Sequence, residues 1–172
     1  ALAVTVLVLA LVRAFVVNPF VLTSTSMQPS FQPGDRVLVA RWQHGGPLRR
    51  GDVVVFDGAA AFGGGTDGDY VKRVVAVGGD RVRCCTQEGR LSVNGVAVAE
   101  PYLFPGEPAS ASPFDILVPA GRVFVLGDHR GESEDSRAHL GGPGGGTVAA
   151  TDVIGQVWVR YWPLDRLGGP GG

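Results

Sequence analysis

Short runs of β-branched and apolar residues, separated by glycine- and proline-rich turns, recur along most of this 172-residue chain. Runs of this kind are typical of β-strands, and their close spacing favours an all-β fold. The runs that we expect to form strands are residues 20–23, 36–40, 53–56, 70–77, 81–84, 91–93, 122–126 and 153–162. We therefore predict a mainly β protein, with an antiparallel β-sheet or a partly open barrel as its main domain.

The pattern changes after residue 83, where the predicted strands become shorter and the connections longer. Asn94-Gly95 is a strong hairpin signal, and residues 101–113 are rich in proline, serine and alanine. We predict a small inserted β lobe at 84–113 and a main domain made of 18–83 and 114–164. Two glycine-rich segments complete the prediction: a surface loop at 57–69 and a disordered tail at 165–172.

Residues 1–17 are apolar except for Thr5 and Arg13. The stretch is shorter than the roughly 20 residues that a membrane-spanning helix needs. It also lacks the basic start and the small-x-small cleavage site of a signal peptide. We infer the C-terminal part of a membrane-spanning helix that begins upstream of this sequence and ends before Asn18-Pro19. The alternative is a buried helix of a soluble protein.

Charge and cysteine content exclude several classes of function. The formal net charge is -1 and the arginines are scattered, so the chain has no nucleic-acid footprint. Cys84 and Cys85 are adjacent, which excludes zinc-ligand spacing and leaves a vicinal disulfide, two free thiols or intermolecular pairing. We expect no metal and no cofactor.

Lys72 is the only lysine among fifteen basic residues, and it lies in a predicted strand. A desolvated lysine can lose its proton and act as a base, whereas arginine stays protonated. A serine hydroxyl needs such a base to become a nucleophile. Histidine is the usual partner, but His44 lies in a glycine-flanked loop and no Gly-x-Ser-x-Gly motif accompanies His129. A dyad of Lys72 with Ser26, on a turn between apolar strands, is the stronger hypothesis.

Four ordered motifs resemble type I signal peptidases, the membrane-anchored Ser/Lys proteases. The motifs are Ser24-Thr25-Ser26-Met27-Gln28-Pro29, Arg50-Gly51-Asp52-Val53-Val54-Val55-Phe56, Tyr70-Val71-Lys72-Arg73-Val74-Val75 and Gly127-Asp128-His129-Arg130 with Ser133-Glu134-Asp135-Ser136-Arg137. The resemblance covers most of the chain, and the adjacent cysteines are similar to those of actinobacterial members. His129 and Gly131-Glu132 depart from the family pattern, which has asparagine and an Asp-Asn pair there.

The resemblance implies a role for each matching residue. Ser26 is the nucleophile and Lys72 the general base, Ser24 and the Ser26 N–H form the oxyanion hole, and Ser133 orients the lysine amine. The implied structural ion pairs involve Arg73, Asp128, Arg130, Asp135 and Arg137. The implied substrate-binding residues are Phe20, Leu22, Met27, Val37, Tyr70 and Val71. A solvated charged loop and an ordinary β core are the alternative interpretations of these two sets.

The resemblance further implies an endopeptidase that removes signal peptides from exported preproteins after small-x-small sites such as Ala-x-Ala. It would be a single-pass protein of the cytoplasmic membrane, with a monomeric catalytic domain on the outer face and the lipid bilayer as a partner. A self-cleaving Ser/Lys repressor-type peptidase is the second hypothesis, although no DNA-binding module precedes the catalytic part. A secreted β-rich binding module is the third, and it leaves the order of Ser26, Lys72 and Ser133 unexplained.

Overall fold

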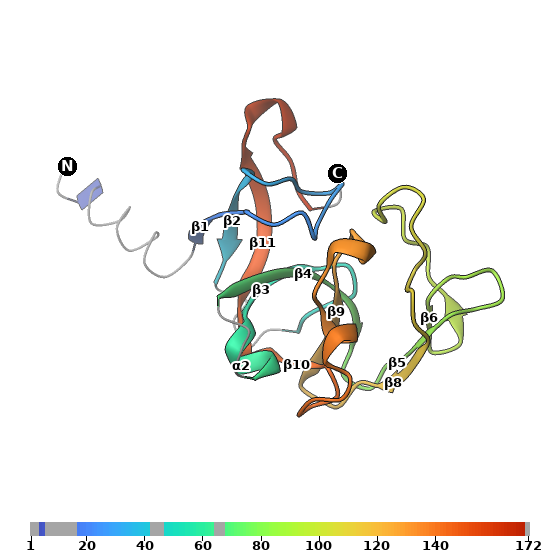
Figure 1. Cartoon of the computed structure of the whole chain (residues 1–172). Coiled ribbons are helices and arrows are strands. Elements are labelled where there is room, and N and C mark those ends of the chain that lie inside the picture. The colour runs from blue at the N-terminus through green and yellow to red at the C-terminus, as the bar shows by residue number, and fades with distance from the viewer. Residues whose placement is uncertain (1–3, 6–16, 42–46, 64–67, 171–172) are drawn as a thin grey trace.

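The protein is mainly β, as the sequence predicts, and consists of two antiparallel sheets (Figure 1). The structure is a computed structural model that describes residues 4–5, 17–41, 47–63 and 68–170. The main sheet has seven strands, which in spatial order are β1 (Val17–Val21), β2 (Arg36–Ala40), β11 (Val153–Trp162), β3 (Val53–Asp57), β4 (Asp69–Val77), β9 (Arg122–Leu126) and β10 (Val148–Ala149). Within the described residues β1 and β10 are its edges, so hydrogen bonds do not close this sheet into a barrel.

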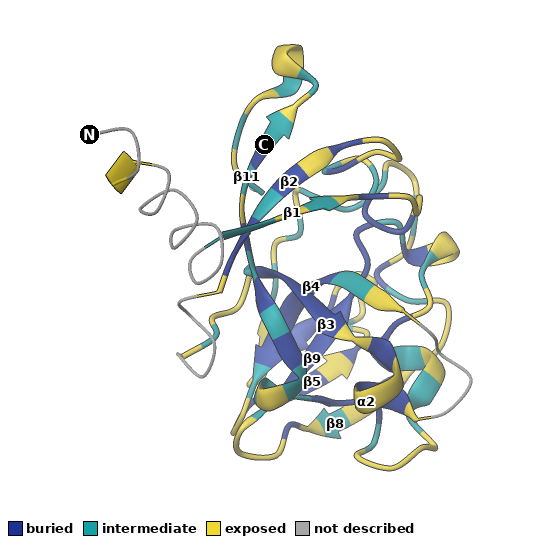
Figure 2. Cartoon of the chain, turned by 90° about the vertical axis from the view of Figure 1, so that its left-hand side faces the viewer, coloured by how far each residue is buried: buried dark blue, intermediate teal, exposed yellow. Residues whose placement is uncertain are grey.

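Both faces of the main sheet are covered, which explains why its central strands read as continuous apolar runs. In β3, Val54 and Phe56 enter one buried cluster while Val53 and Val55 enter another, as the alternation of a strand requires. The second cluster contains Met27 from the turn after β1. Figure 2 shows the buried centre of the sheet in β3, β4 and β9. The turn that carries Ser26 is therefore fastened to the core.

The smaller sheet lies beside the main one and shares a core with it. Its four strands, in spatial order, are β7 (Val96–Ala97), β6 (Ser92–Val93), β5 (Arg81–Cys84) and β8 (Phe114–Leu117). The predicted hairpin is confirmed: β6 and β7 pair across Asn94 and Gly95, which have φ of 54° and 81°. The sheet spans 81–117, somewhat more than the insertion expected at 84–113, and its status as a separate lobe stays a prediction. Cys84 and Cys85 are joined by a disulfide.

Short helices connect the strands. They are α2 (Gly58–Phe62) and the 3₁₀ helices η1 (Arg130–Glu132), η2 (Ser136–His139), η3 (Ala150–Asp152) and η4 (Leu164–Arg166). The loop expected at 57–69 is wrong in part, because α2 occupies its first half. The Asp57 side chain accepts a hydrogen bond from the Ala60 N–H and caps this helix.

The two ends of the chain were expected to form part of a membrane-spanning helix and a disordered tail. Of the apolar stretch 1–17, all but residues 4, 5 and 17 lie outside the described part, and Val17 already belongs to β1, which accommodates Pro19 because it is an edge strand. No helix among the described residues has the length and apolar character needed to cross a bilayer. The disordered tail is a wrong prediction up to Pro170, because Gly168 bridges to Arg160 of β11 and Arg166 pairs with the buried Asp35.

Candidate active site

Ser26 lies on a tight turn that the core holds in place. The Gln28 N–H donates to the Thr25 carbonyl and the Phe31 N–H to the Met27 carbonyl, at 3.0 and 2.9 Å. Met27 and Phe31 are almost fully buried and anchor the turn to the apolar cluster below it. The Ser26 side chain has only 4% exposure. Its hydroxyl is thus held on a rigid turn with little access for water.

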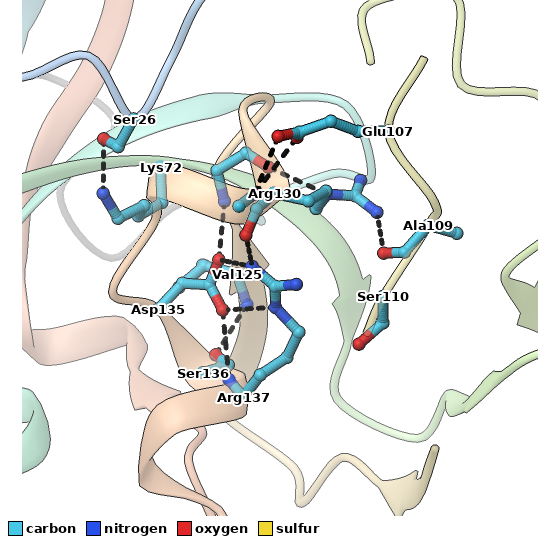
Figure 3. A network of polar contacts seen from close by, with 12 residues as sticks. Ser26, Lys72, Glu107, Ala109, Ser110, Val125, Arg130, Asp135, Ser136 and Arg137 are labelled. Carbon is cyan, nitrogen blue, oxygen red and sulfur yellow. Dashed lines mark hydrogen bonds and ion pairs between the residues drawn. The ribbon is translucent and has the colours of Figure 1, made fainter. Parts of the chain in front are cut away.

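Lys72 reaches the same point from strand β4. Its Nζ donates a hydrogen bond to Ser26 Oγ at 2.7 Å, across 46 residues of sequence (Figure 3). The Lys72 side chain is also only 4% exposed. The structure therefore brings together the two residues that the sequence singled out, in a dry site and at proton-transfer distance.

Burial lowers the pKa of Lys72 from its ordinary value of 10.5 to about 8. The main cause is desolvation, which disfavours the charged amine. The negative charges of Asp135, Glu134 and Asp128 oppose this shift, and the positive charge of Arg137 adds to it. An unpaired lysine on the surface would be almost fully protonated at pH 8, whereas half of the Lys72 amines are neutral there.

Ser24 lies beside the backbone of the Ser26 turn. The Ser26 N–H donates to Ser24 Oγ at 3.1 Å, and the Ser24 side chain is exposed. The hydroxyl and the N–H are therefore neighbours, and the exposed hydroxyl is free to rotate. The structure therefore places side by side the two groups that the sequence analysis expects to form an oxyanion hole.

The structure does not show the hydrogen bond predicted between Ser133 and Lys72. Ser133 Oγ is buried and forms no well-aligned hydrogen bond with the described residues. The hydroxyl nevertheless interacts with Asp135 and helps to lower the pKa of that carboxyl group. The Ser133 side chain instead lies against Gly127, where an added Cβ would meet Ser133 Oγ at 2.2 Å and the Ser26 carbonyl oxygen at 2.5 Å. Glycine at position 127 thus permits the close packing of Ser133 beside the nucleophile turn.

Buried ion pairs surround the two residues. Arg73 forms a bidentate pair with Asp128 at 2.8 and 2.7 Å, and both side chains are almost fully buried. Asp135 accepts from Arg137 and from the Gly127 N–H (Figure 3). Hydrogen bonds from these donors lower the pKa of Asp135 although burial of the carboxylate acts in the opposite direction.

Arg130 differs from the other four predicted ion-pair residues in its partner. Its guanidinium contacts Glu100, which lies in the connection between β7 and β8 of the smaller sheet and was absent from the prediction. The sequence offered no local signal for this pair, because 30 residues separate its members. Buried pairs of this kind fix geometry more reliably than they add stability.

A groove with a volume of about 580 Å³ leads to Ser26 and Lys72. Five of the six predicted substrate-binding residues line it: Phe20, Leu22, Met27, Tyr70 and Val71. The sixth, Val37, is fully buried in the core instead, on β2 opposite Phe20. Residues that the sequence analysis missed also line the groove: Val21, Thr23, Asp69, Glu132 and Glu134. Their positions beside known motif residues are the signal that could have identified them.

Two unpaired backbone edges border this groove. Strand β1 pairs only with β2, and residues 69–72 of β4 pair only with β3, because β9 joins β4 from Arg73 onward. Both statements hold for the described residues. An extended peptide in the groove could therefore form main-chain hydrogen bonds on either side.

The side chains of the two described histidines contact residues other than Ser26. The His129 ring stacks on Phe104 with centroids 4.0 Å apart, and its Nε2 lies 3.3 Å from Glu107. His139 stacks on Phe62 at the same distance, and His44 lies outside the described residues. Among the described residues, no group of three or more His, Cys, Asp or Glu could hold a metal ion.

Comparisons with known proteins find similarity to one family. The family model for "Signal peptidase, peptidase S26" matches residues 1–162. Signal peptidase I of Mycobacterium tuberculosis is 35% identical over 201 residues, which cover 90% of this chain and 68% of that protein. Signal peptidase IB of Staphylococcus aureus is 34% identical over 184 residues, which cover 96% and 88%. A crystal structure of a signal peptidase I from Enterococcus faecalis is 26% identical, with a TM-score of 0.48 and coverage of 64% and 96%.

Proposed function

Since this chain belongs to the signal peptidase family, peptidase S26, and is a serine peptidase, we propose that Ser26 and Lys72 form the dyad with which it cleaves signal peptides. One observation carries the proposal, namely the 2.7 Å contact between Lys72 Nζ and Ser26 Oγ in a nearly water-free site. A lysine with a pKa of about 8 supplies enough neutral amine to accept a hydroxyl proton near physiological pH.

The proposed reaction has two halves. In the first, neutral Lys72 takes the Ser26 hydroxyl proton while Oγ attacks the scissile carbonyl carbon. The resulting tetrahedral intermediate collapses when the Lys72 ammonium donates that proton to the leaving amine, which leaves an ester on Ser26. In the second half, Lys72 takes a proton from water, and the hydroxide displaces Ser26 from the ester. Lys72 then returns the proton to Oγ.

Ser24 and the Ser26 N–H are the proposed donors to the developing oxyanion. In the resting state the Ser26 N–H donates to Ser24 Oγ. When a substrate carbonyl enters, movement of the exposed Ser24 side chain would free this N–H, and the N–H and the hydroxyl would then both donate to the carbonyl oxygen. One such donor typically contributes about 3 kcal/mol to stabilisation of the transition state.

Ser133 is the proposed neighbour that keeps the lysine amine aligned during the reaction. Its packing against Gly127 places it beside the Ser26 carbonyl. Its hydroxyl is buried and forms no hydrogen bond to Lys72 in this structure, so the proposed contact with the amine would form during the reaction. Asp128 and Asp135 support the same role through their pairs with Arg73 and Arg137, which stiffen the loop that carries Ser133.

The proposed substrate is an extended segment with small residues before the scissile bond. The two open strand edges would bind its main chain, so affinity does not require large side chains. Leu22 and Met27 are almost fully buried where the groove meets the nucleophile. Alanine fits against such closed apolar walls, whereas a large side chain would displace them.

We propose that the apolar stretch before β1 belongs to a membrane anchor and that the catalytic domain works on the outer face of the cytoplasmic membrane. Four exposed apolar side chains support lipid contact: Val21, Trp162, Leu164 and Leu167. They lie on β1, on the last residue of β11 and around η4, which projects from the main sheet (Figure 1). Exposed tryptophan and leucine are common where proteins meet the membrane interface.

A preprotein with one Ala-x-Ala site tests the proposed function. We expect the 172-residue chain, in detergent or lipid, to cut it once, directly after the second alanine. Mass spectrometry of both products locates the cut. A matched preprotein with phenylalanine in place of that alanine should stay intact, because the buried Leu22 and Met27 would have to move to admit the ring. Cleavage of both preproteins, or of neither, would contradict the proposal.

The rate of cleavage should rise with pH through about 8, the pKa of Lys72. Below this pH the amine is protonated and cannot accept the Ser26 proton, so kcat/KM should fall about tenfold per pH unit. A pH profile measured with a fluorogenic peptide checks this expectation. An acidic limb centred near pH 6.5, the ordinary pKa of histidine, would point to a different base.

A further inference from the structure

One segment of the connection from β7 to β8, residues 100–109, runs along the loop behind Ser26. We name this segment the strap. Its residues Glu107 and Ala109 reach over Arg130 of the loop 127–131 (Figure 3). The strap has no helix or strand of its own. Its conformation must therefore be maintained by the contacts that it makes with the rest of the chain.

The strap contacts the guanidinium groups of two buried arginines. The Arg130 guanidinium contacts the Glu100 carboxylate and the Ala109 carbonyl, while its Nε donates to the Gly127 carbonyl at 2.8 Å. The Tyr102 ring lies 4.1 Å from the guanidinium carbon of Arg73, the residue that follows Lys72. A buried guanidinium that lost these partners would be left partly unpaired, so the strap and the loop are coupled.

The central part of the strap contacts the side chain of His129. The Phe104 ring stacks on the His129 ring, and Glu107 lies 3.3 Å from His129 Nε2. Backbone bonds reinforce the contact, since the Phe104 N–H donates to the Asp128 carbonyl at 3.0 Å and the Gly131 N–H donates to Glu107 at 3.1 Å. Side-chain and backbone contacts thus fix the loop on both sides of His129.

His129 connects the loop 127–131, which the strap holds in place, to the backbone of Ser26. Its backbone N–H donates to the Ser26 carbonyl at 3.0 Å. This carbonyl also lies against Gly127, where no side chain would fit. The position of the Ser26 backbone therefore depends on the loop, and the loop depends on the strap. A displacement of about 1 Å in a reacting group can cost about a hundredfold in rate.

We propose that Glu107 and His129 are positioning residues for Ser26, and that the strap sets the geometry of the dyad from the smaller sheet. The proposal rests on the proposed function of Ser26 as nucleophile. It also assigns a role to His129, one of the residues at which this chain departs from its family's pattern. Neither side chain touches substrate; both act through the His129 N–H and the Ser26 carbonyl.

The variants E107A, E107Q and D115A test this assignment. Asp115 lies on β8 of the smaller sheet, and its ion pairs among the described residues are with the exposed Arg81 and Arg83. D115A is therefore the matched loss of a carboxylate away from the strap. We expect E107A to lower kcat about tenfold with KM within about twofold of wild type. E107Q keeps an acceptor oxygen for the Gly131 N–H and should stay within about threefold of the wild-type kcat. D115A should leave both constants unchanged.

Hydrogen exchange gives a readout that does not depend on activity. In E107A the amide of His129 should exchange about fivefold to tenfold faster than in wild type, because loss of the Glu107 contacts weakens the hydrogen bond from this amide to the Ser26 carbonyl. In D115A it should exchange at the wild-type rate. Unchanged exchange and kcat in E107A, or equal effects of E107A and D115A, would overturn the proposal. A wild-type chain that cuts no Ala-x-Ala preprotein would instead refute the proposed function, and exchange would still report on the strap.

Discussion

Replacement of Ser26 by alanine should abolish cleavage of an Ala-x-Ala preprotein. We expect kcat to fall about 10⁴-fold to 10⁶-fold, as happens when the nucleophile of a serine protease is removed. The structural reason is that Ser26 Oγ is the hydroxyl bonded to Lys72 at 2.7 Å in the groove. Steady-state kinetics on a fluorogenic peptide, with product analysis by mass spectrometry, measures the loss.

The fold should survive this change. Alanine removes one hydrogen bond from Lys72, which costs about 1–3 kcal/mol, and leaves the Met27 and Phe31 anchors of the turn intact. Thermal unfolding followed by circular dichroism measures that cost. S112A is the matched control, because Ser112 is an exposed serine in the smaller sheet's connection. S26A with more than about 1% of the wild-type rate would rule out Ser26 as the nucleophile.

Lys72→Arg should be nearly as damaging, with kcat lowered at least about 10³-fold. Arginine keeps the positive charge but stays protonated at any working pH, so it cannot take the Ser26 proton. Lys72→Met should lose activity to the same extent, because it removes the base and keeps the apolar stem. The kinetic assay used for Ser26 reads both variants. Activity in K72R within tenfold of wild type would exclude the dyad.

Lys72→Met should also be more stable than wild type at pH 7. The sign follows from the pKa, which is about 8 in the folded chain and near 10.5 when the lysine is exposed. Below pH 8 both states carry the proton, and the folded state bears the full cost of burying the charge, on the order of 3 kcal/mol. As pH rises from 8 to 10.5, the unfolded state binds more proton and wild-type stability increases. A higher melting temperature of K72M at pH 7 would thus separate lost chemistry from lost folding.

The central strands of the main sheet follow from local sequence, whereas the edge strand β1 starts three residues before the run expected at 20–23 and the edge strand β10 was not predicted. Strand β2 has the predicted bounds, and β3 and β4 extend the predicted runs by one residue each. These strands lie between two apolar clusters, so their buried positions are apolar except for the hydrogen-bonded Lys72 and Arg73, and the pattern is unambiguous. Helix α2 was missed because glycine and alanine content suggested a loop, although the capping Asp57 was readable.

Only part of the candidate site could be predicted from the sequence. Lys72 is conspicuous as the sole lysine, and the motif resemblance selected Ser26. Val37 shows the limit for pocket residues, because the same residue type serves a groove and a core, and only the direction of the side chain decides. The contacts of Glu100 and Glu107 were not predictable, since they join residues more than 20 positions apart without any local motif.

Burial makes Lys72 a base, and this claim can be measured on one atom. Because the chain has a single lysine, incorporation of lysine labelled with ¹³C at Cε gives one NMR resonance that reports its protonation. We predict that the chemical shift of this resonance titrates with a midpoint near pH 8. A midpoint at the ordinary value of 10.5 would contradict the account, because almost every Lys72 amine would then be charged near physiological pH.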